Sequence, residues 1–138
     1  MRTTTETKVS HSVLVAFTEK GETLWDYSLD LENIITFGLE QVADFCINNE
    51  KVFFFYKKES ELIVKTITLD TEEIVNTVEK IKLSNETDEI RSEEKSLGGV
   101  RFWYGNSFYV WGKHTIRDNA NRSEGNRQVF YANKVVPD

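Results

Sequence analysis

Short apolar segments that alternate with turn-forming dipeptides constrain the fold of this 138-residue chain more than any other feature. Residues 13–29 contain two such segments around Lys20-Gly21, and residues 100–116 contain two more around Gly105-Asn106. Glycine and asparagine tolerate the positive backbone angles that two-residue hairpin turns require. The pattern therefore predicts two β-hairpins and an all-β, antiparallel fold.

The middle of the chain predicts a longer antiparallel unit. Residues 42–47 are followed by Asn48-Asn49 and then by Val52–Tyr56, five large apolar residues in succession. Such a run is typical of a strand that is covered on both faces. Residues 62–69 alternate and continue the unit, and Asp70-Thr71 predicts its next turn.

Two segments fit either a helix or a strand. In Glu72–Leu83, the residues Ile74, Val78 and Ile81 have helical spacing. However, isoleucine, valine and threonine favour strands, so we expect a strand there. In Leu31–Leu39 the apolar residues could line a helical turn or belong to a strand, and the sequence leaves both open.

We expect a polar N-terminal tail over residues 1–10 and a single β-repeat domain over residues 11–136. Residues 84–98 are mostly charged or hydroxylic and are predicted to form an exposed polar loop. The fold class predicted is an antiparallel meander of about eight to ten strands, grouped in three hairpin-based units.

Two short segments resemble the blades of known β-propellers. Residues 19–27, Glu-Lys-Gly-Glu-Thr-Leu-Trp-Asp-Tyr, resemble the turn and strand of quinoprotein-like propeller blades, and residues 67–73 look like the end of such a blade. The resemblance implies three blade-like units, similar to the C-terminal blades of a bacterial propeller-like protein. Nothing matches the cofactor or calcium ligands of the quinoprotein enzymes, so the resemblance implies no enzymatic activity.

Propellers close with four or more blades, and this chain has material for about three. The resemblance therefore leaves three architectures open. The chain is a partial propeller, or it associates with copies of itself, or it closes alone as a small sandwich or barrel.

Composition and motifs narrow the functional classes. The net charge of −6 disfavours a general nucleic-acid binder. Cys46 is the single cysteine, so an intrachain disulfide and a cysteine-based zinc site are excluded, and its apolar setting predicts a buried thiol. His11 and His114 are too far apart in sequence to form a metal motif, and His114 is predicted to be a buried core residue. We therefore predict no cofactor, no metal site and no catalytic residue.

The N-terminal residues contain no apolar segment typical of a signal peptide, and no apolar run is long enough to span a bilayer. We expect a soluble chain without a membrane partner. The compartment stays open, with export expected only if the chain is part of a longer precursor.

The predicted hairpin at Gly105-Asn106 provides the strongest candidate for a binding surface. A simple two-residue turn places Tyr104 opposite Ser107, Trp103 opposite Phe108, Phe102 opposite Tyr109 and Val100 opposite Trp111. One face then carries the candidate partner-binding residues Phe102, Tyr104, Tyr109, Trp111 and Lys113, with Arg117 and Arg101 at its polar edge. Aromatic rings with polar tips suit a ligand or protein contact, but the more ordinary interpretation is that one face is core and the other packs against a neighbouring sheet.

These observations lead to three functional hypotheses. The first is a non-catalytic β-repeat module that binds proteins, including copies of itself, through the aromatic hairpin and exposed edge strands. The second is a small barrel or sandwich that binds a small molecule or glycan on the face of Tyr109 and Trp111. The third is a fragment of a degenerate propeller enzyme whose active residues lie elsewhere.

Overall fold

The computed structural model describes residues 6–137, without the side chains of residues 95–97. Its internal contacts divide the chain into two compact units, Met1–Glu40 and Gln41–Asp138, which are described one at a time. The prediction of a single domain over residues 11–136 stays a prediction. Residues 1–5 of the predicted tail lie outside the described residues, whereas residues 7–10 belong to the first strand.

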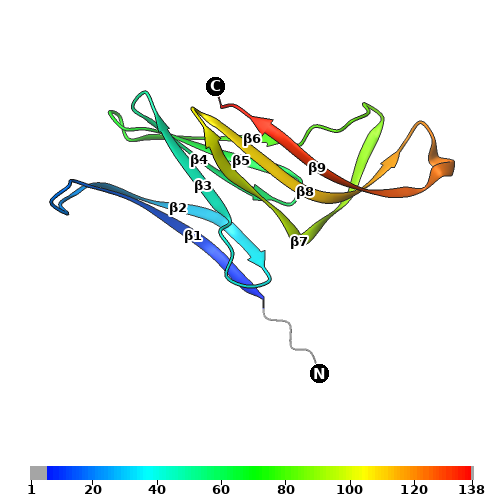
Figure 1. Ribbon diagram of the computed structural model, residues 1–138, viewed down its shortest axis with the longest axis horizontal. Helices are drawn as coiled ribbons and strands as arrows, with labels where there is room; N and C mark the ends of the chain where they lie inside the picture. The colour runs from blue at the N-terminus through cyan, green and yellow to red at the C-terminus, as the bar shows by residue number, and fades with distance from the viewer. Residues whose placement is uncertain (1–5, 138) are drawn as a thin grey trace. The chain divides into compact units, whose positions relative to one another are not determined.

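The first unit is a two-stranded antiparallel sheet formed by β1 (Thr7–Phe17) and β2 (Thr23–Thr36), drawn in blue and cyan in Figure 1. The predicted turn is confirmed, since Gly21 has a φ of 83° and lies between the two strands. The side chain of Thr18 accepts a hydrogen bond from the backbone N–H of Glu22 at 3.1 Å, which closes the turn.

Residues 31–36 continue β2 as a strand, so the helical alternative for Leu31–Leu39 is wrong. The strand is interrupted by an irregularity in which Glu32 and Asn33 have φ angles of 55° and 59°. The carboxylate of Asp30 stabilises this local turn by accepting a hydrogen bond from the backbone N–H of Glu32 at 2.9 Å.

The second unit contains two antiparallel sheets (Figure 1). The four strands of the first sheet follow one another in sequence order: β3 (Ala43–Asn48), β4 (Lys51–Lys58), β5 (Glu61–Thr68) and β6 (Glu73–Lys80). The second sheet also keeps sequence order, with β7 (Asp88–Tyr104), β8 (Ser107–Asp118) and β9 (Asn126–Val135). A short 3₁₀ turn, η1 (Arg122–Glu124), lies in the polar connection between β8 and β9. The predicted all-β antiparallel meander is confirmed, with nine strands in the described residues.

Two local predictions in the first sheet of this unit are confirmed with small changes. The turn between β3 and β4 lies at Asn49 and Glu50, which have φ angles of 50° and 63°, one residue later than predicted. The ambiguous segment 72–83 contains β6, which pairs with β5 along its whole length.

The predicted exposed loop over residues 84–98 is wrong for most of its length, because β7 begins at Asp88. Charged residues can form this strand because their charges have partners across the fold. The buried carboxylate of Asp88 pairs with Arg127 at 3.0 Å, and that of Glu93 pairs with Lys57 at 2.6 Å. These partners are 39 and 36 residues away, so local sequence does not show them.

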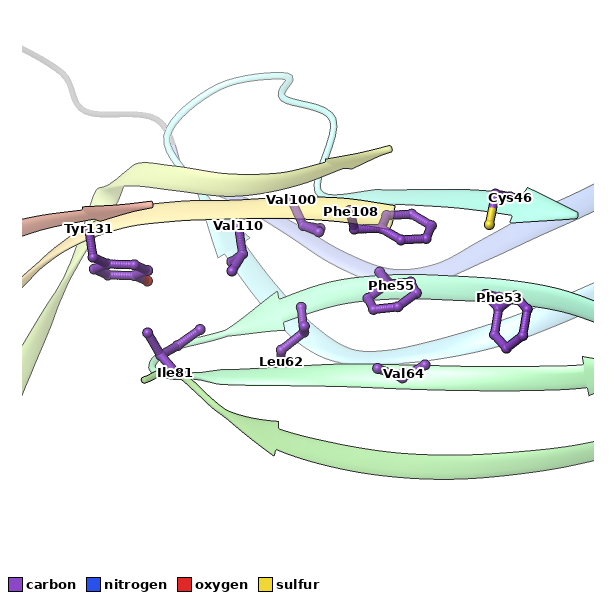
Figure 2. Close-up of a cluster of buried hydrophobic side chains, with 10 residues drawn as sticks. All are labelled: Cys46, Phe53, Phe55, Leu62, Val64, Ile81, Val100, Phe108, Val110 and Tyr131. Carbon is purple, nitrogen blue, oxygen red and sulfur yellow. The ribbon is translucent and has the colours of Figure 1, made fainter. Parts of the chain in front are cut away.

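The core of the second unit lies between its two sheets (Figure 2). The central contact is a stacked pair of rings, Phe55 on β4 and Phe108 on β8, with centroids 3.8 Å apart. Both side chains are fully buried, and all five residues of Val52–Tyr56 are buried as predicted. The cluster around the stacked pair consists of Cys46, Phe53, Phe55, Leu62, Val64, Ile81, Val100, Phe108, Val110 and Tyr131.

We expect Phe55→Ala to lower the free energy of unfolding by about 3–5 kcal/mol, because the change opens a cavity and removes the stacked contact. The matched control is Phe130→Ala, since Phe130 lies on β9 with 63% of its surface exposed. Its effect should stay within about 0.5 kcal/mol in urea denaturation. Equal losses for the two variants would contradict the proposed core.

Candidate functional site

The hairpin between β7 and β8 has the predicted turn but a different register. Tyr104 lies opposite Ser107 as expected, whereas Phe102 lies opposite Phe108 and Arg101 lies opposite Tyr109. Trp103 is an extra residue in β7, so a β-bulge shifts every pair beyond the turn by one residue. The predicted pairs beyond Tyr104 and Ser107 are therefore wrong.

The shifted register changes which residues share a face. Val100 faces the core beside Val110, and Phe102 turns toward Phe108, with ring centroids 5.7 Å apart. Arg101 and Trp103 lie instead on the outer face, where they contact Trp111 and Tyr109. The bulge changes which residues of β7 share a face with those of β8, because one additional residue inverts the side-chain alternation relative to the partner strand.

Four rings form what we call the aromatic surface: Trp103, Tyr104, Tyr109 and Trp111. Trp103 makes edge contacts with Tyr104 and Tyr109, at centroid distances of 4.9 and 6.4 Å. Tyr109 and Trp111 stack at 5.3 Å with an angle of 27° between their planes. Trp103 and Tyr104 are each about half exposed, so this surface is accessible within the second unit.

Two cations border the aromatic surface. The guanidinium carbon of Arg101 lies 5.6 Å from the ring centroid of Trp111, and Arg101 donates to the backbone carbonyl of Gln41 at 3.0 Å. The ammonium of Lys134 lies 4.7 Å from the ring centroid of Tyr104 and donates to its hydroxyl at 2.6 Å. These contacts orient the two cations through neutral groups, so they do not cancel their positive charge.

The structure brings together three of the six predicted site residues: Tyr104, Tyr109 and Trp111. Phe102 instead contacts Phe108, and Lys113 lies two residues beyond Trp111 on β8. Arg117 lies six residues beyond Trp111, which is about 20 Å along an extended strand. Arg117 therefore lies away from the aromatic surface, whereas Lys113 follows Trp111 on the same face of β8.

A second cluster of polar side chains is buried between the two sheets of the second unit. The carboxylate Oε1 of Glu93 accepts hydrogen bonds from Lys57 Nζ and from the Tyr131 hydroxyl, each at 2.6 Å. The His114 ring stacks on Tyr131 at 4.6 Å, and its Nδ1 lies 3.5 Å from Glu93 Oε2. The side chains of Lys57, Glu93 and His114 are 9%, 6% and 2% exposed, so we call this group the buried polar cluster.

A glycine provides the space for the buried polar cluster. A Cβ at Gly112 would lie 2.5 Å from the Tyr131 hydroxyl and 2.6 Å from both Glu93 Oε1 and Lys57 Nζ. A side chain at this position would therefore displace the ion pair. Glycine inside a strand often marks such a close approach of other groups to the backbone.

Two buried atoms of this cluster, Glu93 Oε2 and His114 Nδ1, have no hydrogen-bond partner among the described residues. Both residues border a cavity of about 60 Å³ that is also lined by Ser92, Glu94 and Lys113. A polar cavity of this size is large enough for water to bridge the two atoms.

Burial dominates the titration of His114 and Tyr131. Loss of hydration lowers the pKa of His114, although the neighbouring carboxylate of Glu93 acts in the opposite direction. Burial also raises the pKa of Tyr131, and the hydrogen bond to Glu93 adds to this effect. The Tyr131 hydroxyl therefore keeps its proton and donates a hydrogen bond to the Glu93 carboxylate. Because its groups are bonded to one another inside the fold, this cluster connects β4 to the opposite sheet.

The sequence interpretation found only part of the buried polar cluster. It correctly predicted that His114 is buried, but it assigned Glu93 to an exposed loop and did not single out Lys57 or Tyr131. The sequence does contain one signal for this cluster, which is Gly112 within β8. A glycine inside a strand often marks a place where other groups approach the backbone closely.

No group of three or more His, Cys, Asp or Glu side chains is placed to hold a metal ion in the part of the chain that the structure describes. Among residues 6–137, no helix is long and apolar enough to cross a membrane. Comparisons with protein-family models, with curated proteins and with solved structures found no match to this chain.

We expect Glu93→Gln to destabilise the protein by about 3–5 kcal/mol, because Lys57 would keep a buried charge without its counterion. Glu86→Gln is the matched control, since it removes an exposed carboxylate from the connection before β7 and should cost less than about 1 kcal/mol. Urea denaturation at pH 7.5 measures both values. Similar stabilities for the two variants would show that the ion pair contributes little.

The lowered pKa of His114 also predicts a pH dependence of stability. The pKa is below 6.5 in the folded state, so the unfolded chain binds a proton more readily as the pH falls. The contribution of His114 to stability is therefore complete above pH 6.5 and decreases as the solution is acidified from pH 7.5 to 5.5.

Measuring the free energy of unfolding across this range tests the prediction. His114→Gln should flatten the decrease, whereas His11→Gln, at an exposed position on β1, should leave it in place. An unchanged slope in His114→Gln would contradict the assignment to His114.

Proposed function

We propose that this chain is a non-catalytic assembly module that binds protein through its aromatic surface, with a second copy of the chain as partner. The observation that carries the proposal is the accessible group of Trp103, Tyr104 and Tyr109 with Arg101 beside it. Tryptophan, tyrosine and arginine contribute most of the binding energy at protein interfaces, because they bury large areas and keep a polar tip.

The relative orientation of the rings supports a protein partner over a glycan. A sugar ring stacks on an open, flat aromatic face, but the planes of Trp103 and Tyr109 differ by 83°. The faces of Tyr109 and Trp111 are turned toward each other, and Arg101 lies over Trp111. An uneven surface of this kind suits the interdigitated side chains of a protein interface.

The charge balance supports a second copy as the partner. The chain carries 23 acidic and 17 basic residues, for a net charge of −6, whereas Arg101 and Lys134 make the border of the aromatic surface locally positive. An acidic region on another copy would therefore be attracted to this border.

Self-association would also agree with the propeller-like resemblance, which remains part of the proposal. The sheet β3–β6 is a four-stranded antiparallel meander, which is the arrangement of one propeller blade. A chain with too few blades to close a propeller could complete its assembly with further copies.

The test is the mass in solution, measured by light scattering across a concentration series. We expect the average mass to rise above 16.0 kDa with concentration. The double variant Trp103→Ala/Tyr109→Ala should weaken association by about thirtyfold or more, as expected for hot-spot residues.

Phe17→Ala is the matched control, because it removes an exposed ring from β1 and should leave association unchanged. A mass that stays at 16.0 kDa at every concentration would overturn self-association. If the double variant associated as strongly as the unmodified chain, the aromatic surface would not be the interface.

A further inference from the structure

A cavity of about 170 Å³ lies at one end of the second unit, where the core between its two sheets reaches the surface. Leu62 on β5, Ile81 after β6 and Val110 on β8 line its apolar part. Figure 2 shows these three side chains on facing sides of the core. One part of the cavity wall therefore offers apolar contacts to a small ligand, whereas the rest of the lining is polar or charged.

Asn133 is a polar residue on this apolar wall. It lies on β9 directly opposite Val110, on the inward face that also carries Tyr131 and Val135. Its Nδ2 is buried and has no hydrogen-bond partner among the described residues, and the residue lines the cavity. Buried amide groups in proteins are nearly always hydrogen-bonded, so an unpaired one beside a cavity indicates a place for an oxygen acceptor.

Charged side chains surround the same cavity. Lys80 and Lys82 are exposed residues of its lining, and Glu79 supplies one negative charge. Lys134 contributes its aliphatic stem, since its ammonium donates to the Tyr104 hydroxyl. The local charge is positive in a chain whose net charge is −6, which favours an anionic ligand.

We propose that this cavity binds a small carboxylic acid with an apolar body. The carboxylate accepts a hydrogen bond from Asn133 and is attracted by Lys80 and Lys82, while the body packs against Leu62 and Val110. A volume of about 150 Å³ is enough for one benzene molecule, so the volume of this cavity, about 170 Å³, accommodates a body of about six carbons. The site is separate from the aromatic surface and does not depend on the proposed self-association.

The test is an NMR titration of the full chain with benzoate and with hexanoate at pH 7, with benzamide as the uncharged analogue of benzoate. We expect saturable shifts of backbone amides around Leu62, Val110 and Asn133 with at least one carboxylate. Benzamide should bind at least about tenfold more weakly. Absence of saturable shifts with both carboxylates, or equal affinity for benzamide and benzoate, would overturn the proposal.

Variants assign the binding to the cavity. Asn133→Leu should abolish binding while raising the melting temperature, because it replaces an unpaired buried amide with an apolar side chain. Lys80→Met/Lys82→Met should weaken benzoate binding several-fold without affecting the fold, whereas Lys51→Met, at the opposite end of the β4–β5–β6 strands, should leave it unchanged. Binding that survives both the Asn133 variant and the double lysine variant would contradict the site.

Discussion

The stacked contact between Phe55 and Phe108 is the interaction on which the second unit depends. It joins β4 of one sheet to β8 of the other, and both rings are fully buried. Because side chains alternate along a strand, fixing Phe108 inward also fixes Val110 and His114 inward and Tyr109 and Trp111 outward. The aromatic surface is therefore a consequence of the core on the opposite face of the same strand.

The buried polar cluster adds a second connection between the same sheets. Lys57 extends from β4 to Glu93 on β7, and Tyr131 on β9 bonds to the same carboxylate oxygen. A buried ion pair gains little net stability over an apolar core, but it permits one arrangement of its partners. The close approach at Gly112 restricts that arrangement further, since a larger residue would displace the charged groups. Apolar contacts thus provide cohesion, whereas the polar cluster specifies alignment.

The sequence predicted the features that depend on local chemistry. The turns at Lys20-Gly21 and Gly105-Asn106, the strand character of residues 73–80 and the burial of Val52–Tyr56 follow from residue type and alternation. The register beyond the β7–β8 turn could not be predicted in this way. Aromatic residues occupy both faces of the hairpin, so the pattern of apolar and polar residues does not reveal the extra residue at Trp103. The strand over residues 88–98 was missed for another reason, since the partners of its buried carboxylates lie more than 30 residues away.

The bulge at Trp103 connects the fold to the proposed binding surface, because it moves Arg101 and Trp103 to the outer face of the hairpin. Cross-strand nuclear Overhauser effects between backbone protons of β7 and β8 measure this register directly. The structure predicts contacts that pair Arg101 with Tyr109 and Val100 with Val110. Contacts that pair Phe102 with Tyr109 and Val100 with Trp111 would show a hairpin without the bulge, and would contradict both the outer aromatic surface and the core beneath it.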